Sequence, residues 1–97
     1  MDAATLTVKT NAAAALLKAM GNERRLSILL YLSQGEKSVG ELEQLVGLSQ
    51  SALSQHLAVL RQEGLVCTRR QAQTIFYRLD GETVSAVLTL VRRHFPA

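Results

Sequence analysis

A run of small polar residues in the middle of the chain is the segment best suited to chemistry. Residues Ser49 to His56 include three serines, two glutamines and a histidine. Hydroxyl and amide groups both donate and accept hydrogen bonds, as the edges of DNA bases require, and glutamine can bridge N6 and N7 of adenine. No acidic residue occurs from Gln44 to Gln62, where Arg61 is the one certain charge. The pattern therefore predicts a surface that can approach DNA and read its bases.

The alternative is an ordinary solvated face of a helical domain, because polar residues point outward in any such domain. Charged residues usually dominate a face that is merely solvated, and this one nearly lacks them, so base reading is favoured. The candidate DNA contacts of the segment are Ser49, Gln50, Ser51, Ser54, Gln55, His56 and Arg61.

Two consecutive arginines, Arg69 and Arg70, follow this segment. We expect them at the tip of a β-hairpin, where a guanidinium can bind phosphate oxygens through two parallel hydrogen bonds. The alternative is a charged tip that only protects a sheet edge from pairing with other strands. Arg78, on the second strand, is expected to face a neighbouring carboxylate.

Five helices and one hairpin are needed to position these residues. Apolar residues at helical spacing predict helices at about 5–20, 22–34, 38–46, 49–63 and 80–94. Residues rich in β-branched and aromatic types predict strands at 65–70 and 74–79, joined by 71–73. The expected N-caps are Asn22, Ser38 (in a capping box with Glu41), Ser49 and Asp80, and the expected C-terminal stops are Gly35, Gly47 and Gly64.

The two short helices between residues 38 and 63 form the expected helix-turn-helix. Such a motif needs an apolar lock between its helices and a second helix whose outer face can enter the major groove of DNA. The hairpin at 65–79 is then a candidate wing. The predicted fold is mainly α with a small β-hairpin, a winged helix-turn-helix in a single domain of 97 residues. The lock is expected to consist of Leu42, Leu45 and Val46 against Leu53 and Leu57.

Composition limits the other possibilities. The net charge of +3 suits an anionic partner such as double-stranded DNA but does not by itself indicate one. A single cysteine excludes an intrachain disulfide and a cysteine-rich zinc site, and it favours a reducing cytoplasm. No apolar run reaches the roughly 20 residues of a membrane span, and no secretory leader is evident. Ser54 and His56, two residues apart on a helix, point to different sides and so do not form a nucleophile and its base. With no other catalytic arrangement evident in the sequence, we expect neither an enzyme nor a cofactor.

Several stretches of the chain resemble the ArsR (SmtB/ArsR) family of winged helix-turn-helix repressors. They are LKAMGNERRL at 17–26, SVGEL at 38–42 and LSQSALSQHL at 48–57. The stretches LRQEGLV at 60–66 and AQTIFY at 72–77 further resemble the subgroup that contains HlyU, BigR, SqrR and NolR. The resemblance implies the same order of elements, a homodimer assembled from the helices at 5–20 and 80–94, and binding to a palindromic operator. Apolar stripes on both terminal helices also favour a dimer, unless each stripe folds back onto its own domain.

The effector sites of that family are not matched. Metal sensors of the family carry a Cys-x-Cys where this chain has Ser38 and Gly40, and the redox members carry cysteines where it has Leu30 and about Pro96. His94 has no second histidine nearby, so we expect no metal. No inducer follows from the sequence, and a constitutive regulator fits as well as a sensor.

Cys67, on the first hairpin strand, is the remaining thiol. The neighbouring Arg69 and Arg70 would favour its thiolate form if the side chain were exposed. Free cysteines are usually buried, so we expect a core-facing Cys67 and keep a redox thiol as the alternative.

A winged-helix module used only for contacts with other proteins would have the same fold. Such a module should expose apolar anchors rather than a Ser/Gln face and an arginine pair, which favours DNA. RNA binding is disfavoured because the sequence offers no aromatic stacking surface.

Overall fold

The computed structural model describes residues 2–97, except the side chains of residues 4–8. Within this range the order of elements is the one expected for a winged helix-turn-helix, which confirms the predicted fold class. The elements are α1 (Ala3–Met20), α2 (Glu23–Leu32), β1 (Lys37–Ser38), α3 (Val39–Val46), α4 (Gln50–Gln62), β2 (Val66–Gln71), β3 (Thr74–Leu79) and α5 (Glu82–His94).

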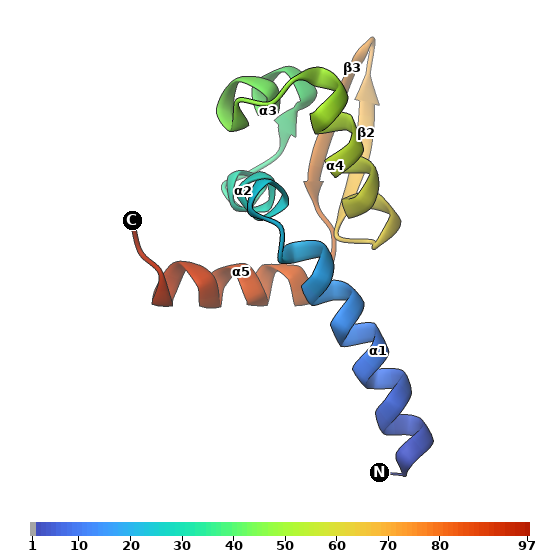
Figure 1. Cartoon of the computed structure of the whole chain (residues 1–97). Helices are drawn as coiled ribbons and strands as arrows, with labels where there is room; N and C mark the ends of the chain where they lie inside the picture. Colours follow the sequence, from blue (N-terminus) through green and yellow to red (C-terminus); the bar gives the residue numbers. More distant parts are fainter. Residues whose placement is uncertain (1) are drawn as a thin grey trace.

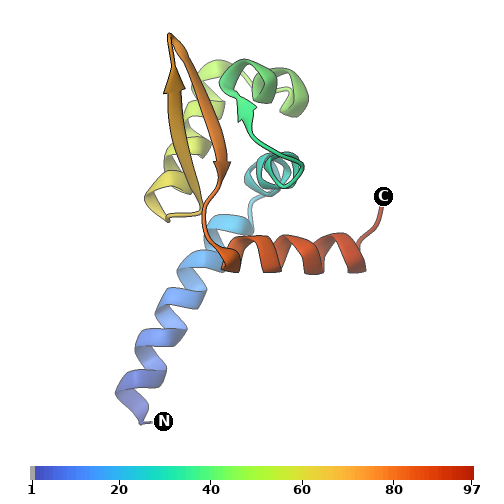
Figure 2. The same cartoon turned by 180° about the vertical axis from the view of Figure 1, so that it is seen from behind.

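Helices α2, α3 and α4 and the hairpin of β2 and β3 form one body, from which α1 projects (Figure 1). Seen from behind, α5 runs beneath this body and starts at the end of β3 that lies opposite the hairpin turn (Figure 2). The terminal helices therefore occupy one end of the molecule and the hairpin turn occupies the other.

The core is built from the apolar stripes of α2, α3, α4 and α5 together with the inner face of the sheet. One-sided helices bury such stripes because they remove hydrocarbon from water. Its fully buried side chains are Ile28, Leu29, Leu42, Leu53, Leu57, Leu60, Val84 and Leu88.

The expected apolar lock of the helix-turn-helix is correct in four of its five members, and Leu45 is the wrong one. Leu42 and Val46, four residues apart on α3, are buried together with Leu53 of α4. Leu45 lies outside this stripe and is 42% exposed. The apolar residues whose helical spacing predicts the first helix include Leu6 and Met20. Met20 is buried on α1, and the side chain of Leu6 lies outside the described ones.

The sheet has a third strand that the sequence analysis did not predict. β1 is only two residues long and pairs antiparallel with β3, so the strand order is β1-β3-β2. The hairpin turn is also one residue tighter than expected. Gln71 belongs to β2 and pairs with Thr74, which leaves Ala72 and Gln73 as the turn. Ala72 has a φ of 54°, a left-handed conformation that is uncommon for residues other than glycine.

Most of the expected helix caps are present. The Asn22 side chain accepts hydrogen bonds from the amides of Arg24 and Arg25, and Gly47 ends α3 with a φ of 73°. Ser38 and Glu41 form the complete capping box, Ser49 accepts from the amide of Ala52, and Gly64 follows α4 with a φ of 73°.

Two predicted boundaries are wrong. Asp80 does not cap α5, since its own amide donates to the carbonyl of Leu65 and Gly81 takes the N-cap position. Likewise α2 ends at Leu32 with Ser33 as its C-cap, so Gly35 lies in the following turn, where its amide donates to the carbonyl of Leu32.

Candidate DNA-binding surface

The N-terminal half of α4 presents the polar face that the sequence predicted. Ser49 and Gln50 are exposed at the start of the helix, and the Ser49 hydroxyl accepts a hydrogen bond of 3.2 Å from the amide of Ala52. Ser51, Ser54 and Gln55 are also exposed. The leucines on the opposite side of α4 are buried, so packing fixes which face of the helix points outward.

The end of α3, before the turn to α4, is fixed by two hydrogen bonds. The amide of Gly47 donates to the carbonyl of Glu43 over 3.0 Å, and the left-handed φ of Gly47 redirects the chain. From α2, the Arg24 guanidinium donates to the carbonyl of Val46 over 3.5 Å. The last turn of α3 is therefore tied both to the turn and to α2.

His56 lies at the edge of the polar face and not on its outer side. It is half-buried, with Nδ1 3.5 Å from Nη1 of Arg25. Burial, and then the charges of Arg25 and Arg24, lower the pKa of His56, so the neutral imidazole is favoured. The neutral ring can accept a hydrogen bond from the guanidinium.

Arg25 joins α4 to the end of α1, a role that the sequence analysis missed. Its Nε donates to the carbonyl of Ala19 over 2.7 Å, and its Nη2 donates to that of Lys18 over 3.3 Å. Carbonyls in the last turn of a helix lack partners within the helix, and the negative end of the helix dipole attracts a cation. No sequence pattern marks this contact, because it forms only when the turn between α1 and α2 folds.

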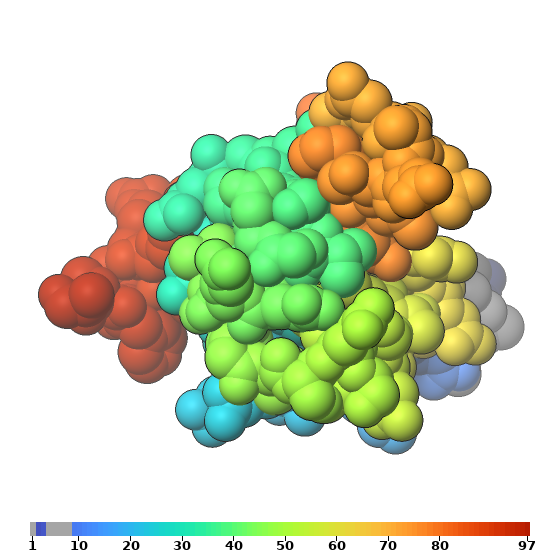
Figure 3. Space-filling view, turned by 90° about the horizontal axis from the view of Figure 1, so that it is seen from above, coloured from blue at the N-terminus to red at the C-terminus, as the bar shows by residue number. Residues whose placement is uncertain are grey.

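The hairpin stands beside α3 and the start of α4. Its turn protrudes at the rim of the face seen in Figure 3. Arg69 and Arg70 lie within β2 and not at the tip, because the register places Ala72 and Gln73 in the turn. The expectation of a tip position is therefore wrong for both. Arg70 and, on α4, Arg61 are exposed.

Arg69 is engaged by other side chains. It forms an ion pair of 2.7 Å with Glu36, a residue that the sequence analysis did not single out. Its guanidinium also stacks on the Phe76 ring, 4.3 Å from the centroid. Arg78, expected to face a carboxylate, donates from Nε to the Cys67 sulfur over 3.0 Å, and the charges of Glu36 and Asp80 also act on its guanidinium.

Cys67 does not face the core, so the expected arrangement is wrong. Val66 points into the core, and alternation along the strand places the next residue on the outer face of the sheet. The thiol is half-buried there beside Arg78, and the hydrogen bond to Cys67 raises the pKa of Arg78. The sequence lacked the strand register that would have decided this.

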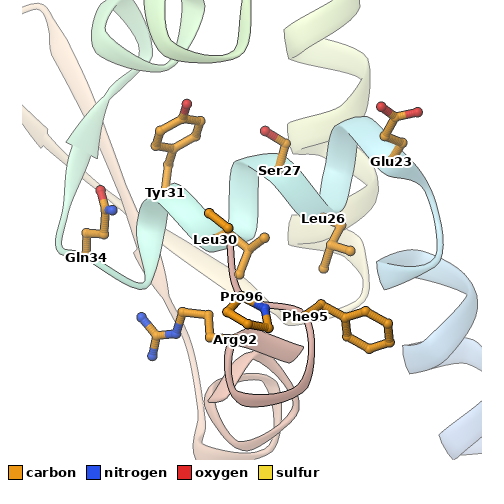
Figure 4. Close-up of a pocket in the computed structure, with 10 residues that line it drawn as sticks. Glu23, Leu26, Ser27, Leu30, Tyr31, Gln34, Arg92, Phe95 and Pro96 are labelled. Carbon is orange, nitrogen blue, oxygen red and sulfur yellow. The ribbon is translucent and has the colours of Figure 1, made fainter. Parts of the chain in front are cut away.

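A pocket of about 680 Å³ separates α2 from the C-terminal end of α5. Leu30 and Pro96, the two positions matched to the cysteines of redox-sensing family members, both line it (Figure 4). Apolar side chains dominate this wall, where Leu26 and Phe95 lie close to them. Among the described residues, no group of three His, Cys, Asp or Glu side chains could hold a metal ion, and no helix is long and apolar enough to cross a membrane.

Several known proteins are similar to this chain in sequence and fold. Residues 22–68 match the family model described as bacterial regulatory protein, arsR family. The transcriptional activator HlyU of Vibrio cholerae is 59% identical over 81 residues, which cover 84% of this chain and 75% of that protein. A biofilm growth-associated repressor of Xylella fastidiosa is 45% identical over 86 residues, 84% of this chain and 75% of that protein.

Solved structures agree with these relationships. Reduced HlyU from Vibrio cholerae superposes with a TM-score of 0.92 at 52% identity, over 96% of this chain and 98% of that one. The homodimeric winged helix-turn-helix DNA-binding domain of a possible ArsR-family regulator from Mycobacterium bovis gives a TM-score of 0.84 at 32% identity, over 97% and 86% of the two chains. The polar face of α4, the hairpin beside it and these relatives together establish that the chain belongs to the arsR family of DNA-binding transcriptional regulators.

Proposed function

We propose that the chain is a homodimeric repressor that binds a palindromic operator in double-stranded DNA. In each protomer the N-terminal half of α4 enters a major groove and directs Gln50, Ser51, Ser54 and Gln55 toward base edges. The observation that carries the proposal is this exposed, nearly uncharged hydrogen-bonding face, which the buried side of α4 holds in a fixed orientation.

Contacts to the DNA backbone would come from both sides of that face. Arg61 on α4 and Arg70 on β2 are exposed cations, and such groups add affinity that depends on salt but not on sequence. Ser49 and His56 border the reading face and complete the proposed contact set. Among the described residues, the polar face of α4 carries no exposed large apolar side chain, although Ile75 on β3 of the wing is 36% exposed.

The dimer is supported by apolar surface on the two terminal helices. Leu17 on α1 is 57% exposed and Leu90 on α5 is 56% exposed, in a chain with little core to spare. The relative from Mycobacterium bovis is homodimeric. We propose that α1 and α5 form the interface, which would place the two α4 helices about one helical turn of DNA apart.

The proposed regulator acts in the cytoplasm and represses by occupying its operator. Leu30 and about Pro96 match the positions of the thiols in the redox-sensing members, so control by protein level or by competition for the operator is proposed in place of that switch.

Selection of bound sequences from a random duplex pool tests the proposal. A palindromic consensus with half-sites about one turn apart is expected, and a reporter driven by that sequence should lose expression when the protein is present. Recovery of an unenriched pool would contradict sequence-specific binding. An asymmetric consensus would contradict the symmetric dimer.

A further inference from the structure

The guanidinium of Arg69 is already occupied on all three of its nitrogens. Nε donates to both carboxylate oxygens of Glu36 over 2.9 Å, and Nη2 donates to Oε1 of the same group over 2.7 Å. Nη1 donates to Oε1 of Gln71 over 3.0 Å. The ring of Phe76 covers one face of the guanidinium. Arg69 is thus held flat against the sheet by side chains from several positions.

The ion pair crosses the whole width of the sheet. Glu36 immediately precedes β1, Arg69 lies on β2, and Phe76 on the central strand β3 is the pairing partner of both Ser38 and Arg69. The hydrogen bond from Arg69, with the charges of Arg69 and Arg78, lowers the pKa of Glu36 despite its partial desolvation. The carboxylate is therefore ionised at neutral pH, and the charge of Arg69 is matched.

Arg70, one residue further along β2, is in the opposite situation. Successive residues of a strand point to opposite faces, so Arg70 shares the side of Val66 while Arg69 lies on the outer face with Cys67. Arg70 is exposed, and no hydrogen bond or ion pair joins its side chain to another of the described residues.

A phosphate would use the same donors that the carboxylate of Glu36 occupies. Both anions accept paired N–H groups from the edge of a guanidinium, so Arg69 cannot offer that edge to DNA while it binds Glu36. Each cation that neutralises a phosphate releases counterions and steepens the salt dependence of binding by about 0.9 logarithmic units. Removal of one such contact from each protomer would therefore lower affinity for every DNA sequence alike.

We propose that Glu36 limits the affinity of this regulator for DNA by withholding Arg69, so that β2 contacts phosphates through Arg70 alone. Glu36 is then a residue that sets sequence-independent binding without touching DNA. This inference rests on the proposed DNA-binding function.

The test is a double-mutant cycle read out by the salt dependence of DNA binding. Glu36→Gln should bind both operator and random duplexes more tightly, with a salt slope steeper by about two units for a dimer. Its advantage over the wild type should shrink about tenfold between about 50 and 200 mM salt. Arg69→Ala in the Glu36→Gln background should abolish the gain. Arg69→Ala alone should change the slope much less than Arg70→Ala does.

Glu82→Gln is the control for loss of one carboxylate, because Glu82 begins α5 at the end of the molecule away from the hairpin turn. It should not steepen the slope as Glu36→Gln does. Thermal unfolding of each variant checks that the fold is retained. Weaker binding by folded Glu36→Gln, or a slope equal to that of Glu82→Gln, would overturn the inference. If the wild type selected no sequence and bound no duplex, the DNA-binding proposal itself would fail instead.

Discussion

At the scale of single residues, some exposed polar side chains are free to contact DNA, and others are already bound to neighbouring side chains. Helical periodicity was enough to identify Gln50 and Ser54 as exposed, because the buried leucines of α4 fix the opposite face. The partner of Arg69 could not be predicted, since Glu36 lies 33 residues away and meets it only when three strands assemble. The orientation of Cys67 depended on the same register.

The exposed amide of Gln50 gives the first prediction. Gln50→Ala should lower the preference for operator over random DNA by about 1–3 kcal/mol per lost base contact, because a bidentate amide contact discriminates between bases. Binding to random duplexes should change little, as that term comes from phosphates. Competition between labelled operator and random duplex measures the ratio. Gln62→Ala, at the far end of α4, is the matched control, and an equal effect from both variants would contradict the assignment.

His56 gives a prediction for pH. The folded protein holds its pKa below the unfolded value of about 6.5, so the unfolded chain binds the proton more readily. The stabilisation is therefore complete above that value and is lost as the pH falls through the folded pKa. In His56→Gln the midpoint of thermal unfolding should fall less between about pH 7 and 5 than in the wild type. His94→Gln controls for removal of an imidazole, and an unchanged profile in His56→Gln would refute this.

At the scale of elements, the fold was predictable wherever local chemistry decides the backbone. The ends of α3 and α4 were predicted correctly from capping side chains and left-handed glycines. Each of these residues acts within a few positions of itself along the chain. β1 was not predicted because two residues are too few to show a periodic pattern. Their pairing with β3 is a tertiary contact. The Asp80 prediction failed because α5 begins one residue later, with Gly81 at the N-cap position and no side-chain cap.

The capping box of α3 can be tested by stability. Ser38→Ala removes the hydroxyl that accepts a hydrogen bond of 3.1 Å from the amide of Glu41. The free energy of unfolding should therefore fall by about 1 kcal/mol. Denaturation by urea measures the change. Ser38→Thr keeps a capping hydroxyl and should retain most of the stability. Equal losses in the two variants would mean that the cap does not stabilise α3.

At the scale of the whole molecule, α1 projects from the body, and α5 packs beneath it through the buried Val84 and Leu88. The exposed leucines on both helices are stabilised if another apolar surface covers them. A second copy of the chain carries such a surface on its own terminal helices. The sequence predicted the stripes, but it could not show which residues remain uncovered after the domain has folded on itself.

Leu90→Glu tests this surface. The substitution places a charge at an exposed position of α5, so the monomer should fold while the dimer dissociates. Loss of two-site binding should weaken operator affinity by about 10²–10⁴-fold. Sedimentation and operator titration measure the two effects. Leu45→Glu, exposed on α3, is the control for assembly, and a Leu90→Glu protein that stays dimeric would place the interface elsewhere.

The contacts of Arg25 have a consequence for how such a dimer would measure DNA. One guanidinium binds the last carbonyls of α1 and touches the imidazole on α4, so a rotation of either helix against the other would break hydrogen bonds. If α1 forms the dimer interface and α4 reads the operator, the angle between α1 and α4 determines how far apart the two α4 helices lie. That distance would set the spacing between half-sites that the dimer can bind. A chain with a different residue at position 25 should therefore tolerate a wider range of spacings.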